Sequence, residues 1–170
     1  QTVLNVTTYG AVGDGVTDDY PAFVAALDAV AQLSPAQVIL QIPDGSYRLA
    51  LSQSADSSAG HLKISGISNL TVEASNQATL ICGSPYHHGI YINASDNITV
   101  RNLAVDYDPL PHTQGTVVAT TPASRYVDIT IDPGFPLPTE DHIDGYGGAH
   151  TATNVGYLYD PTTGRKLNQY

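Results

Sequence analysis

Apolar and polar residues alternate in short runs along most of this chain, and one longer stretch has a helical period. Apolar residues recur every three or four positions over residues 21–33, which predicts an amphipathic helix. Asp18 and Asp19 precede this stretch and offer an N-cap and a favourable interaction with the helix dipole. Pro21 falls in the predicted first turn, and Pro35 is expected to end the helix.

Short strands are predicted for almost everything after the helix. Val38–Ile42 is an apolar run, residues 43–45 are a turn signal, and residues 46–51 return as a strand. A polar loop is predicted at 52–60, and further strands at 79–82 and 89–92. Residues 116–121 and 125–132 are predicted to form an antiparallel hairpin. After Pro133 the chain is predicted to be mostly loop, apart from a short strand at 155–159.

A repeat connects two of the strand regions. Ile64–Val72 (ISGISNLTV) matches Ile92–Val100 (INASDNITV), with Asn69 and Asn97 at equivalent positions 28 residues apart. A period of this length with several short strands in it is typical of a stacked parallel solenoid. A β-sandwich is the competing architecture, but it predicts no such repeat.

The composition excludes several classes of protein. The chain has 170 residues, of which 42% are hydrophobic, but no apolar run long enough to span a membrane. Six Lys and Arg against 16 Asp and Glu give a net charge of −10, the opposite of what nucleic acids or anionic membranes attract. Charged residues make up only 13%, and abundant Thr, Ser, Asn and Gly predict a secreted or cell-surface β-protein.

Two further features of the composition concern processing and redox chemistry. The chain contains no Met, so Gln1 is expected to follow a removed signal peptide or to lie inside a longer product. The single cysteine, Cys82, is predicted to be a small buried hydrophobe in a strand, because it has no partner for a disulfide within the chain.

The N-terminal third carries a family resemblance. Tyr9–Asp19 (YGAVGDGVTDD), the helix after it and Val38–Tyr47 (VILQIPDGSY) resemble the N-terminus of pectin-lyase-like right-handed parallel β-helix proteins. The resemblance implies an all-β, right-handed parallel β-helix (a solenoid) with an N-terminal capping α-helix and an inserted β-hairpin. Val105–Gly115 (VDYDPLPHTQG) is similar to a segment of secreted α-1,3-galactosidases.

A division of the chain follows from the resemblance. Residues 1–48 would form the N-terminal cap with the first strands, and residues 49–105 the early rungs of the β-helix. Residues 106–170 would hold the hairpin and Gly/Pro/Tyr-rich loops, as part of a larger β-helix domain. The superfamily includes lyases, hydrolases, epimerases and phage tailspikes, most of which act on long carbohydrates.

The candidate catalytic residues are Asp106 and Asp108. Two positions apart on a strand, their carboxylates would share a face and serve as acid and base in glycoside cleavage, or as calcium ligands in a lyase. The alternative is an Asp-Pro turn with solvated or N–H-bonded carboxylates. His112 and Gln114 would suit sugar hydroxyls, or are plain loop residues.

A second acidic cluster lies nearer the C-terminus. Glu140, Asp141, His142 and Asp144 would bind sugar or a cation, with a solvated loop as the alternative. Asp141 and His142 are the candidate substrate-binding residues of this cluster. The adjacent histidines His87 and His88 resemble neither a metal-binding motif nor a catalytic triad. No metal or other cofactor is therefore predicted, except calcium if the protein is lyase-like.

Four Asn-x-Ser/Thr sequons suggest N-glycosylation of a secreted chain, with turn-forming Asn and strand-forming Thr as the alternative. They begin at Asn5, Asn69, Asn93 and Asn97.

Two functions follow as hypotheses. The first is the N-terminal part of a secreted carbohydrate-active β-helix enzyme, with glycoside hydrolase as the favoured activity, whose remaining catalytic residues lie in later rungs. Polygalacturonases have characteristic residue sets, Asn-Thr-Asp, Gly-His-Gly and Arg-Ile-Lys. None of these sets is found in this sequence. The second is a non-catalytic structural or adhesive protein that assembles head-to-tail with copies of itself through its β-helix ends.

Overall fold

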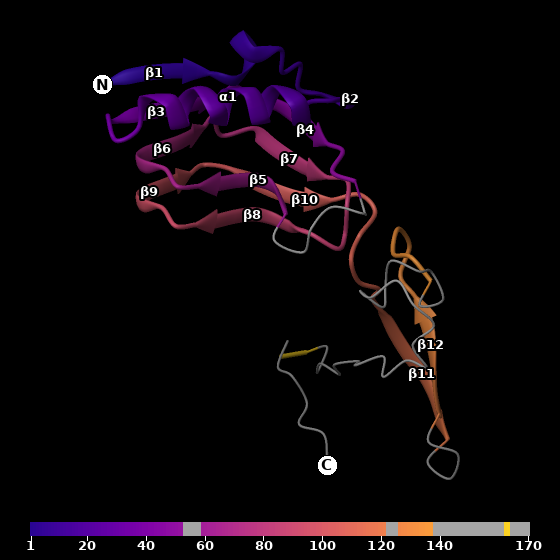
Figure 1. Ribbon diagram of the computed structural model, residues 1–170. Helices are drawn as coiled ribbons and strands as arrows, with labels where there is room; N and C mark the ends of the chain where they lie inside the picture. Colours follow the sequence, from indigo (N-terminus) through magenta and orange to yellow (C-terminus); the bar gives the residue numbers. More distant parts are fainter. Residues whose placement is uncertain (53–58, 122–125, 138–161, 164–170) are drawn as a thin grey trace.

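The structure, a computed structural model, describes residues 1–52, 59–121, 126–137 and 162–163. Figure 1 shows one α-helix and a short 3-10 helix among many short strands. The elements are β1 (Thr2–Asn5), η1 (Val6–Tyr9), β2 (Asp14–Asp18), α1 (Tyr20–Leu33), β3 (Val38–Ile42), β4 (Gly45–Leu49), β5 (Gly60–Ser65), β6 (Ser68–Ala74), β7 (Ala78–Cys82), β8 (His88–Asn93), β9 (Asp96–Arg101), β10 (Ala104–Tyr107), β11 (Gly115–Thr121) and β12 (Tyr126–Ile131).

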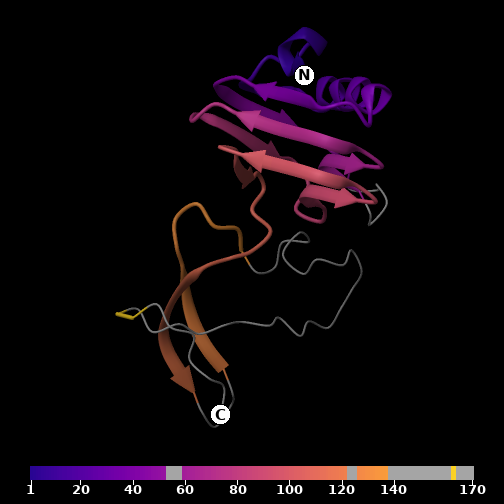
Figure 2. The ribbon, with the colours of Figure 1, turned by 90° about the vertical axis from the view of Figure 1, so that its left-hand side faces the viewer.

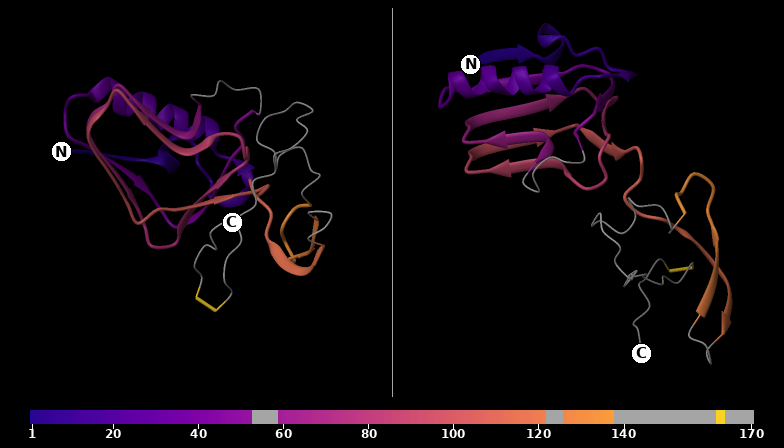
Figure 3. Two further views of the ribbon diagram at one scale, coloured as in Figure 1. Left: turned by 90° about the horizontal axis from the view of Figure 1, so that it is seen from below. Right: turned by 45° about the vertical axis from the view of Figure 1, so that its right-hand side comes forward.

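In the described residues, three parallel sheets contribute side chains to one hydrophobic core. Their strand orders are β1-β3-β6-β9, β10-β7-β4-β2 and β5-β8, and each pair within them is parallel. Figure 2 shows the strands stacked turn upon turn, and Figure 3 shows from below that the sheets form different sides of this stack. We call one turn of the chain through the sheets a coil. The architecture is mostly β with parallel sheets, which fits the predicted all-β parallel β-helix.

The register of the stacked strands confirms the repeat. Leu70 pairs with Ile98 and Val72 with Val100 between β6 and β9, the pairing that the 28-residue offset predicted. Alternate residues of β3, β6 and β7 point into the core and are fully buried, while the residues between them face outward. Cys82, at the end of β7, is buried as predicted.

Helix α1 confirms the predicted helix to within one residue. Its buried face contacts η1, β1, β3 and β5, and Figure 2 shows it end-on beside the uppermost strands. Pro21 lies in the first turn, and Ser34 caps the C-terminal end just before Pro35. The buried residues of the helix are Ala22, Phe23, Ala26, Leu27 and Val30.

Of the two aspartates predicted to cap α1, only Asp18 does so with its side chain. Asp18 is the residue whose Oδ1 accepts the Tyr20 N–H (3.0 Å), and the same oxygen accepts the Ala50 N–H (3.0 Å). Asp19 occupies the N-cap position, but its side chain makes no capping hydrogen bond. The Asp19 carboxylate turns away from the helix because the preceding turn offers it two N–H donors.

The glycine-rich turn before α1 is organised around that carboxylate. Asp19 is 1% exposed, and its two oxygens accept the N–H groups of Val12 (2.7 Å) and Gly13 (3.1 Å). Gly13 has φ +73°, and a Cβ there would lie 2.9 Å from the ring of Tyr47. Glycine is therefore required at this position for both backbone and space.

The predicted hairpin is confirmed as the antiparallel pair β11 and β12. Figure 1 shows it projecting beyond the end of β10. The strand predicted at 155–159 and the acidic cluster at 140–144 lie outside the described residues.

Candidate functional site

A row of outward-facing side chains, all but one of them charged, crosses the β10-β7-β4-β2 sheet. Asp18 pairs in register with Arg48, Arg48 with Ile81, and Ile81 with Asp106. Residues on either side of Arg48 in β4 are buried, so this row occupies the outward-facing positions. The row brings side chains from residues 18 to 106 of the sequence onto one surface.

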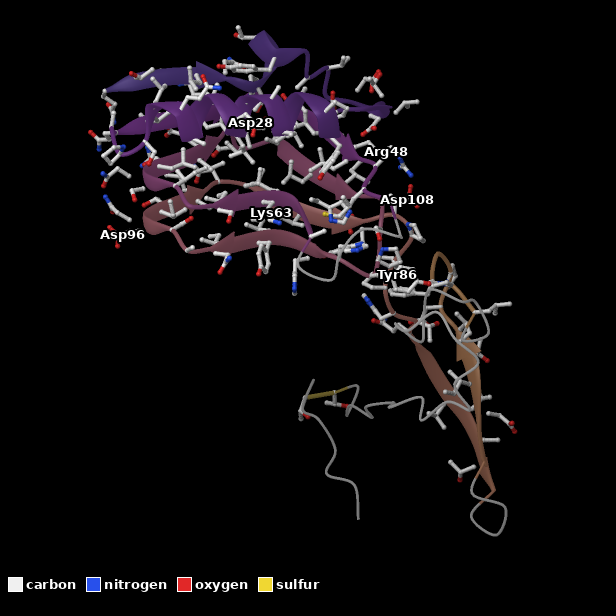
Figure 4. All side chains as sticks on the ribbon, in the orientation of Figure 1. Asp28, Arg48, Lys63, Tyr86, Asp96 and Asp108 are labelled. Carbon is white, nitrogen blue, oxygen red and sulfur yellow. The ribbon has the colours of Figure 1, made fainter. Side chains whose placement is uncertain are left out.

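Asp106 and Asp108 lie at the lower end of this surface. Both side chains are exposed. Asp106 accepts the N–H of Tyr107 (2.8 Å), whereas Asp108, one residue beyond β10, forms an ion pair with Arg48 (Nη1 to Oδ2, 2.8 Å; Figure 4). One carboxylate of the predicted pair therefore has a cationic partner and the other accepts a backbone N–H.

The other predicted sugar contacts that the structure describes lie beside the hairpin. Gln114 donates to Asp132 (Nε2 to Oδ2, 3.0 Å), and the His112 ring is 5.6 Å from the Phe135 ring. Both contacts are made to residues 132–135, after β12, and not to the two aspartates. Asp141 and His142 lie outside the described part of the chain.

A second outward-facing group lies on the β5-β8 sheet. Lys63 of β5 pairs in register with Tyr91 of β8, and its Nζ is 5.9 Å from the centre of the Tyr91 ring. The His88 ring stacks on Tyr91 at 5.5 Å with an interplanar angle of 21°. A Cβ on Gly60 would lie 2.5 Å from the Cβ of Tyr91, so glycine at residue 60 allows Tyr91 to lie across β5.

A groove of about 260 Å³ separates this sheet from helix α1. Its helix wall includes Tyr20, Leu27 and Asp28, and its strand wall includes Lys63 and Ser65. Figure 4 shows Asp28 on α1 above Lys63 on β5. The groove exists because α1 lies next to the free edge of β5, and a helix cannot form the backbone hydrogen bonds that a neighbouring strand would form there.

A buried polar cluster lies beneath the β5-β8 surface. His61 is 1% exposed; its Nε2 accepts the N–H of Ser84 (3.1 Å), and its Nδ1 lies 3.0 Å from the carbonyl oxygen of His88. A carbonyl only accepts, so Nδ1 carries the proton and the imidazole is neutral. Ser84 also contacts Nδ1 of His87 (2.7 Å), and the Tyr107 hydroxyl donates to the His87 carbonyl (2.9 Å).

The stability of the protein is expected to fall when the solution becomes acidic, because of His61. Burial lowers the pKa of His61 from 6.5, and nearby His87 lowers it further, while the hydrogen bond to His88 partly opposes this. Below pH 6.5 the unfolded chain therefore takes up a proton that the folded chain does not, and the free energy of unfolding falls by at most about 1.4 kcal/mol per pH unit. Urea unfolding at several pH values measures this slope.

The variant His61→Gln isolates this contribution. It should flatten the part of the pH dependence that lies just below 6.5, whereas the exposed His88→Gln should leave that part unchanged. Equal slopes in wild type and His61→Gln would show that another group causes the loss.

Cys82 belongs to the core rather than to a reactive site. Burial raises the pKa of its thiol to about 12, and the carboxylate of Asp106 acts in the same direction. A thiol with this pKa carries almost no thiolate at neutral pH, so it is a poor nucleophile.

The four sequons have different surroundings. Asn69 and Asn97 form a ladder in which Asn97 Nδ2 donates to Asn69 Oδ1 (2.8 Å) and Asn69 Nδ2 donates to the carbonyl of Pro35 (2.8 Å). Both have positive φ, which the turn between strands requires. Asn5 caps η1 through its side-chain oxygen, and Asn93 is exposed at the end of β8. A glycan would compete with hydrogen bonds of the fold at Asn69 and Asn97.

Metal and membrane sites were sought in the described residues. They contain no group of three or more His, Cys, Asp or Glu side chains placed to hold a metal ion. None of their helices is long and apolar enough to cross a membrane.

Several residues of these surfaces were missed from the sequence. Arg48 was overlooked because its partner Asp108 lies 60 residues away, in another coil. Lys63 and Tyr91 carried a usable signal: the 28-residue repeat that aligns Ile64 with Ile92 also aligns these two. His61 lies in β5, between the predicted loop, which ended at residue 60, and the repeat, which began at residue 64, so no strand was predicted there.

Comparisons with known proteins place the chain in a family. Residues 3–134 match the family described as rhamnogalacturonase A/epimerase, pectate lyase-like. A comparison with curated proteins found no match. Among solved structures, the chain is similar to the A-module of the Azotobacter vinelandii mannuronan C-5 epimerase AlgE6, at 28% identity and a TM-score of 0.47, over 61% of this chain and 28% of that one.

The chain thus spans about a quarter of the length of that solved relative. The family match covers α1 and the stacked strands together with the hairpin. It confirms the predicted resemblance to pectin-lyase-like parallel β-helix proteins. The chain belongs to the pectate lyase-like rhamnogalacturonase A/epimerase family, whose members are carbohydrate-active β-helix proteins.

Proposed function

We propose that this chain is the N-terminal part of a secreted glycoside hydrolase that cleaves a poly- or oligosaccharide. Membership of a carbohydrate-active family supports the substrate class. The observation that carries the reaction type is the pair of exposed carboxylates, Asp106 and Asp108, at the end of an outward charged row. A stacked β-structure offers a long face on which successive sugars can lie.

The two carboxylates have different surroundings. Glycoside cleavage uses one carboxyl group to protonate the leaving oxygen and one carboxylate to act as base or nucleophile. Asp108 has Arg48 as counterion, whereas Asp106 accepts the backbone N–H of Tyr107. In this proposal the two carboxyl groups share the acid and base roles.

The remaining residues have supporting roles in the proposal. His112 and Gln114 contact sugar hydroxyls, and Asp141 and His142 extend this contact from the C-terminal segment. Helix α1 caps the N-terminal end of a closed solenoid, since its apolar face packs on the first strands and its other face is solvated. Residues 1–48 form this cap, 49–105 the rungs, and 106–170 the start of a larger domain.

The reaction is tested with carboxamide variants in the full-length natural protein. Asp106→Asn and Asp108→Asn should each lower turnover on the cleaved polysaccharide a hundredfold or more, the usual scale for a positioned acid or base. Release of reducing ends from a polysaccharide panel measures turnover, and unsaturated product ends would indicate a lyase. Asp96→Asn, an exposed aspartate at the start of β9, is the matched control. Unchanged kinetics in both variants would remove the pair from the mechanism.

A second candidate function, head-to-tail assembly, is favoured by the exposed end of the stack. In the last described coil Ile92 is 48% and Val105 40% exposed, whereas their partners Ile64 and Leu80 in the coil above are 0% exposed. Apolar side chains at such an end, beside unpaired strand edges, invite contact with a further coil, from a longer chain or another copy.

Sedimentation of the 170-residue chain alone distinguishes contact with another copy from contact with a further coil of a longer chain. Concentration-dependent association is expected, and Ile92→Asp should reduce it while leaving the upper coils folded. A monomer at all concentrations that melts cooperatively would contradict the assembly function.

A further inference from the structure

We infer that Tyr107 is a positioning residue for the carboxylates of Asp106 and Asp108, and that the buried polar cluster beneath the β5-β8 surface holds its side chain. The inference deepens the proposed function and rests on it for the role of the two carboxylates. The observation behind it is a hydroxyl group with buried polar contacts on the last residue of β10, directly between the two aspartates.

Strand β10 is paired on one side only in the described part of the chain. It is the end strand of the β10-β7-β4-β2 sheet, and β7 is its partner. One residue beyond β10, the N–H of Asp108 donates to the carbonyl oxygen of Cys82 (3.1 Å). The ion pair of Asp108 with Arg48 is exposed, and exposed pairs contribute little to holding a backbone in place. Because an end strand opens more readily than a strand between two others, the placement of the carboxylates depends on a further contact.

The alternation of side chains along β10 turns Tyr107 inward between two outward-facing neighbours. Tyr107 pairs in register with the buried Cys82, whereas Asp106 pairs with Ile81, which faces outward on β7. Asp108, the next residue after Tyr107, is exposed like Asp106. Fixing the inward side chain of Tyr107 therefore fixes the stretch of backbone that carries both carboxylates.

The Tyr107 hydroxyl has an acceptor and a donor on the segment that leads into β8. It donates to the carbonyl of His87 (2.9 Å), and the backbone of Gly89 forms a hydrogen bond with the same hydroxyl. Burial raises the pKa of Tyr107, and Cys82 acts in the same direction, so the hydroxyl keeps its proton at neutral pH. A Cβ on Gly89 would lie 2.8 Å from Cγ1 of Val105 and 3.3 Å from the Tyr107 hydroxyl, so β10 lies directly against this segment.

The buried cluster makes this segment a firm support. The His61 ring meets the Tyr107 ring edge to face, with the ring centres 6.1 Å apart. The same imidazole accepts the Ser84 N–H (3.1 Å) and bonds the carbonyl of His88 (3.0 Å), so it ties both ends of the turn before β8 to β5. His61, Ser84 and His87 are at most 6% exposed, so water does not readily replace these contacts.

Tyr107→Phe in the full-length protein tests the inference, because it removes the hydroxyl and keeps the ring. Hydrogen exchange of the backbone amides of residues 105–108, followed by mass spectrometry, should become about tenfold faster or more. Turnover should fall about tenfold or more while KM stays within about twofold of wild type, since a small misplacement of a reacting group lowers the rate of the chemical step.

Tyr47→Phe is the matched control. Tyr47 is 1% exposed and its hydroxyl donates to the carbonyl of Pro43 (3.0 Å), so this variant also loses a buried tyrosine hydrogen bond. Its strand, β4, is paired on both sides, with β2 and β7. Tyr47→Phe should therefore leave both the exchange of residues 105–108 and turnover unchanged.

Wild-type exchange of residues 105–108 in Tyr107→Phe would overturn the inference. Wild-type turnover in that variant would also overturn it, where Asp106→Asn and Asp108→Asn lose theirs. Slow exchange in Tyr107→Phe with turnover still dependent on the pair would refute the positioning role alone. Faster exchange in Tyr107→Phe, with turnover unchanged in both carboxamide variants, would refute the catalytic pair alone.

Discussion

Asp19→Ala is expected to destabilise the protein by about 3–6 kcal/mol, because it removes the buried carboxylate that accepts hydrogen bonds from two backbone N–H groups. A hydrogen bond to a charged group contributes about 1.5–3 kcal/mol, and the Val12 and Gly13 N–H groups each donate one to the Asp19 carboxylate. The residue is 1% exposed, so water does not readily replace the lost oxygens. The loss is measured by urea unfolding at pH 7.5, above the range in which His61 titrates.

Asp14 provides a matched control in the same turn. Its carboxylate accepts the N–H groups of Val16 (2.9 Å) and Thr17 (2.7 Å), but the side chain is exposed, so water can replace it. Asp14→Ala should therefore cost less than half of the loss seen in Asp19→Ala. A wild-type unfolding midpoint in Asp19→Ala would show that the turn does not depend on this carboxylate.

Leu40→Ala is expected to cost about 2–5 kcal/mol, the range for a leucine removed from a packed core. Leu40 is 0% exposed in β3, between Leu4 of β1 and Val72 of β6. The cavity would lie between strands whose positions are fixed by backbone hydrogen bonds to their neighbours. The surrounding side chains therefore have little freedom to move in and fill it. Thermal and urea unfolding give the magnitude.

The neighbouring outward position supplies the control for this core variant. Gln41 follows Leu40 on the same strand and is exposed on the outer face. Gln41→Ala should change stability by no more than about 0.5 kcal/mol, as surface substitutions usually do. Equal losses in the two variants would mean that β3 does not have the inward and outward faces described.

The parts of the fold that sequence predicted are those with a periodic apolar signal. The helix over residues 21–33 and the registers Leu70 to Ile98 and Val72 to Val100 were predicted because burial repeats with a fixed spacing. Strand β2 was missed because its residues have no apolar alternation; Val16, at its centre, is 81% exposed. Backbone pairing with β4 and the carboxylate-bound turns form it instead.

The candidate site was less accessible to sequence reasoning. The pairing of Arg48 with Asp108 depends on which coil lies beside which, and no local pattern encodes that. The role of Asp19 was misjudged because its partners are backbone N–H groups, which every residue but proline offers and which leave no mark in the sequence. Asp106 and Asp108 were chosen as candidates because they lie two residues apart in the sequence; their chemical role stays a prediction.

The register between β6 and β9 also constrains how proteins of this kind change in length during evolution. A step of 28 residues returns the chain to the same side chain environment one strand below. Duplicating or deleting a whole coil keeps every inward residue stacked on another, whereas a one-residue insertion within a strand turns its inward side chains outward. An outer surface built this way grows in increments of one strand spacing, about 4.8 Å, so the length of that surface is set by the number of coils and not by the length of the loops.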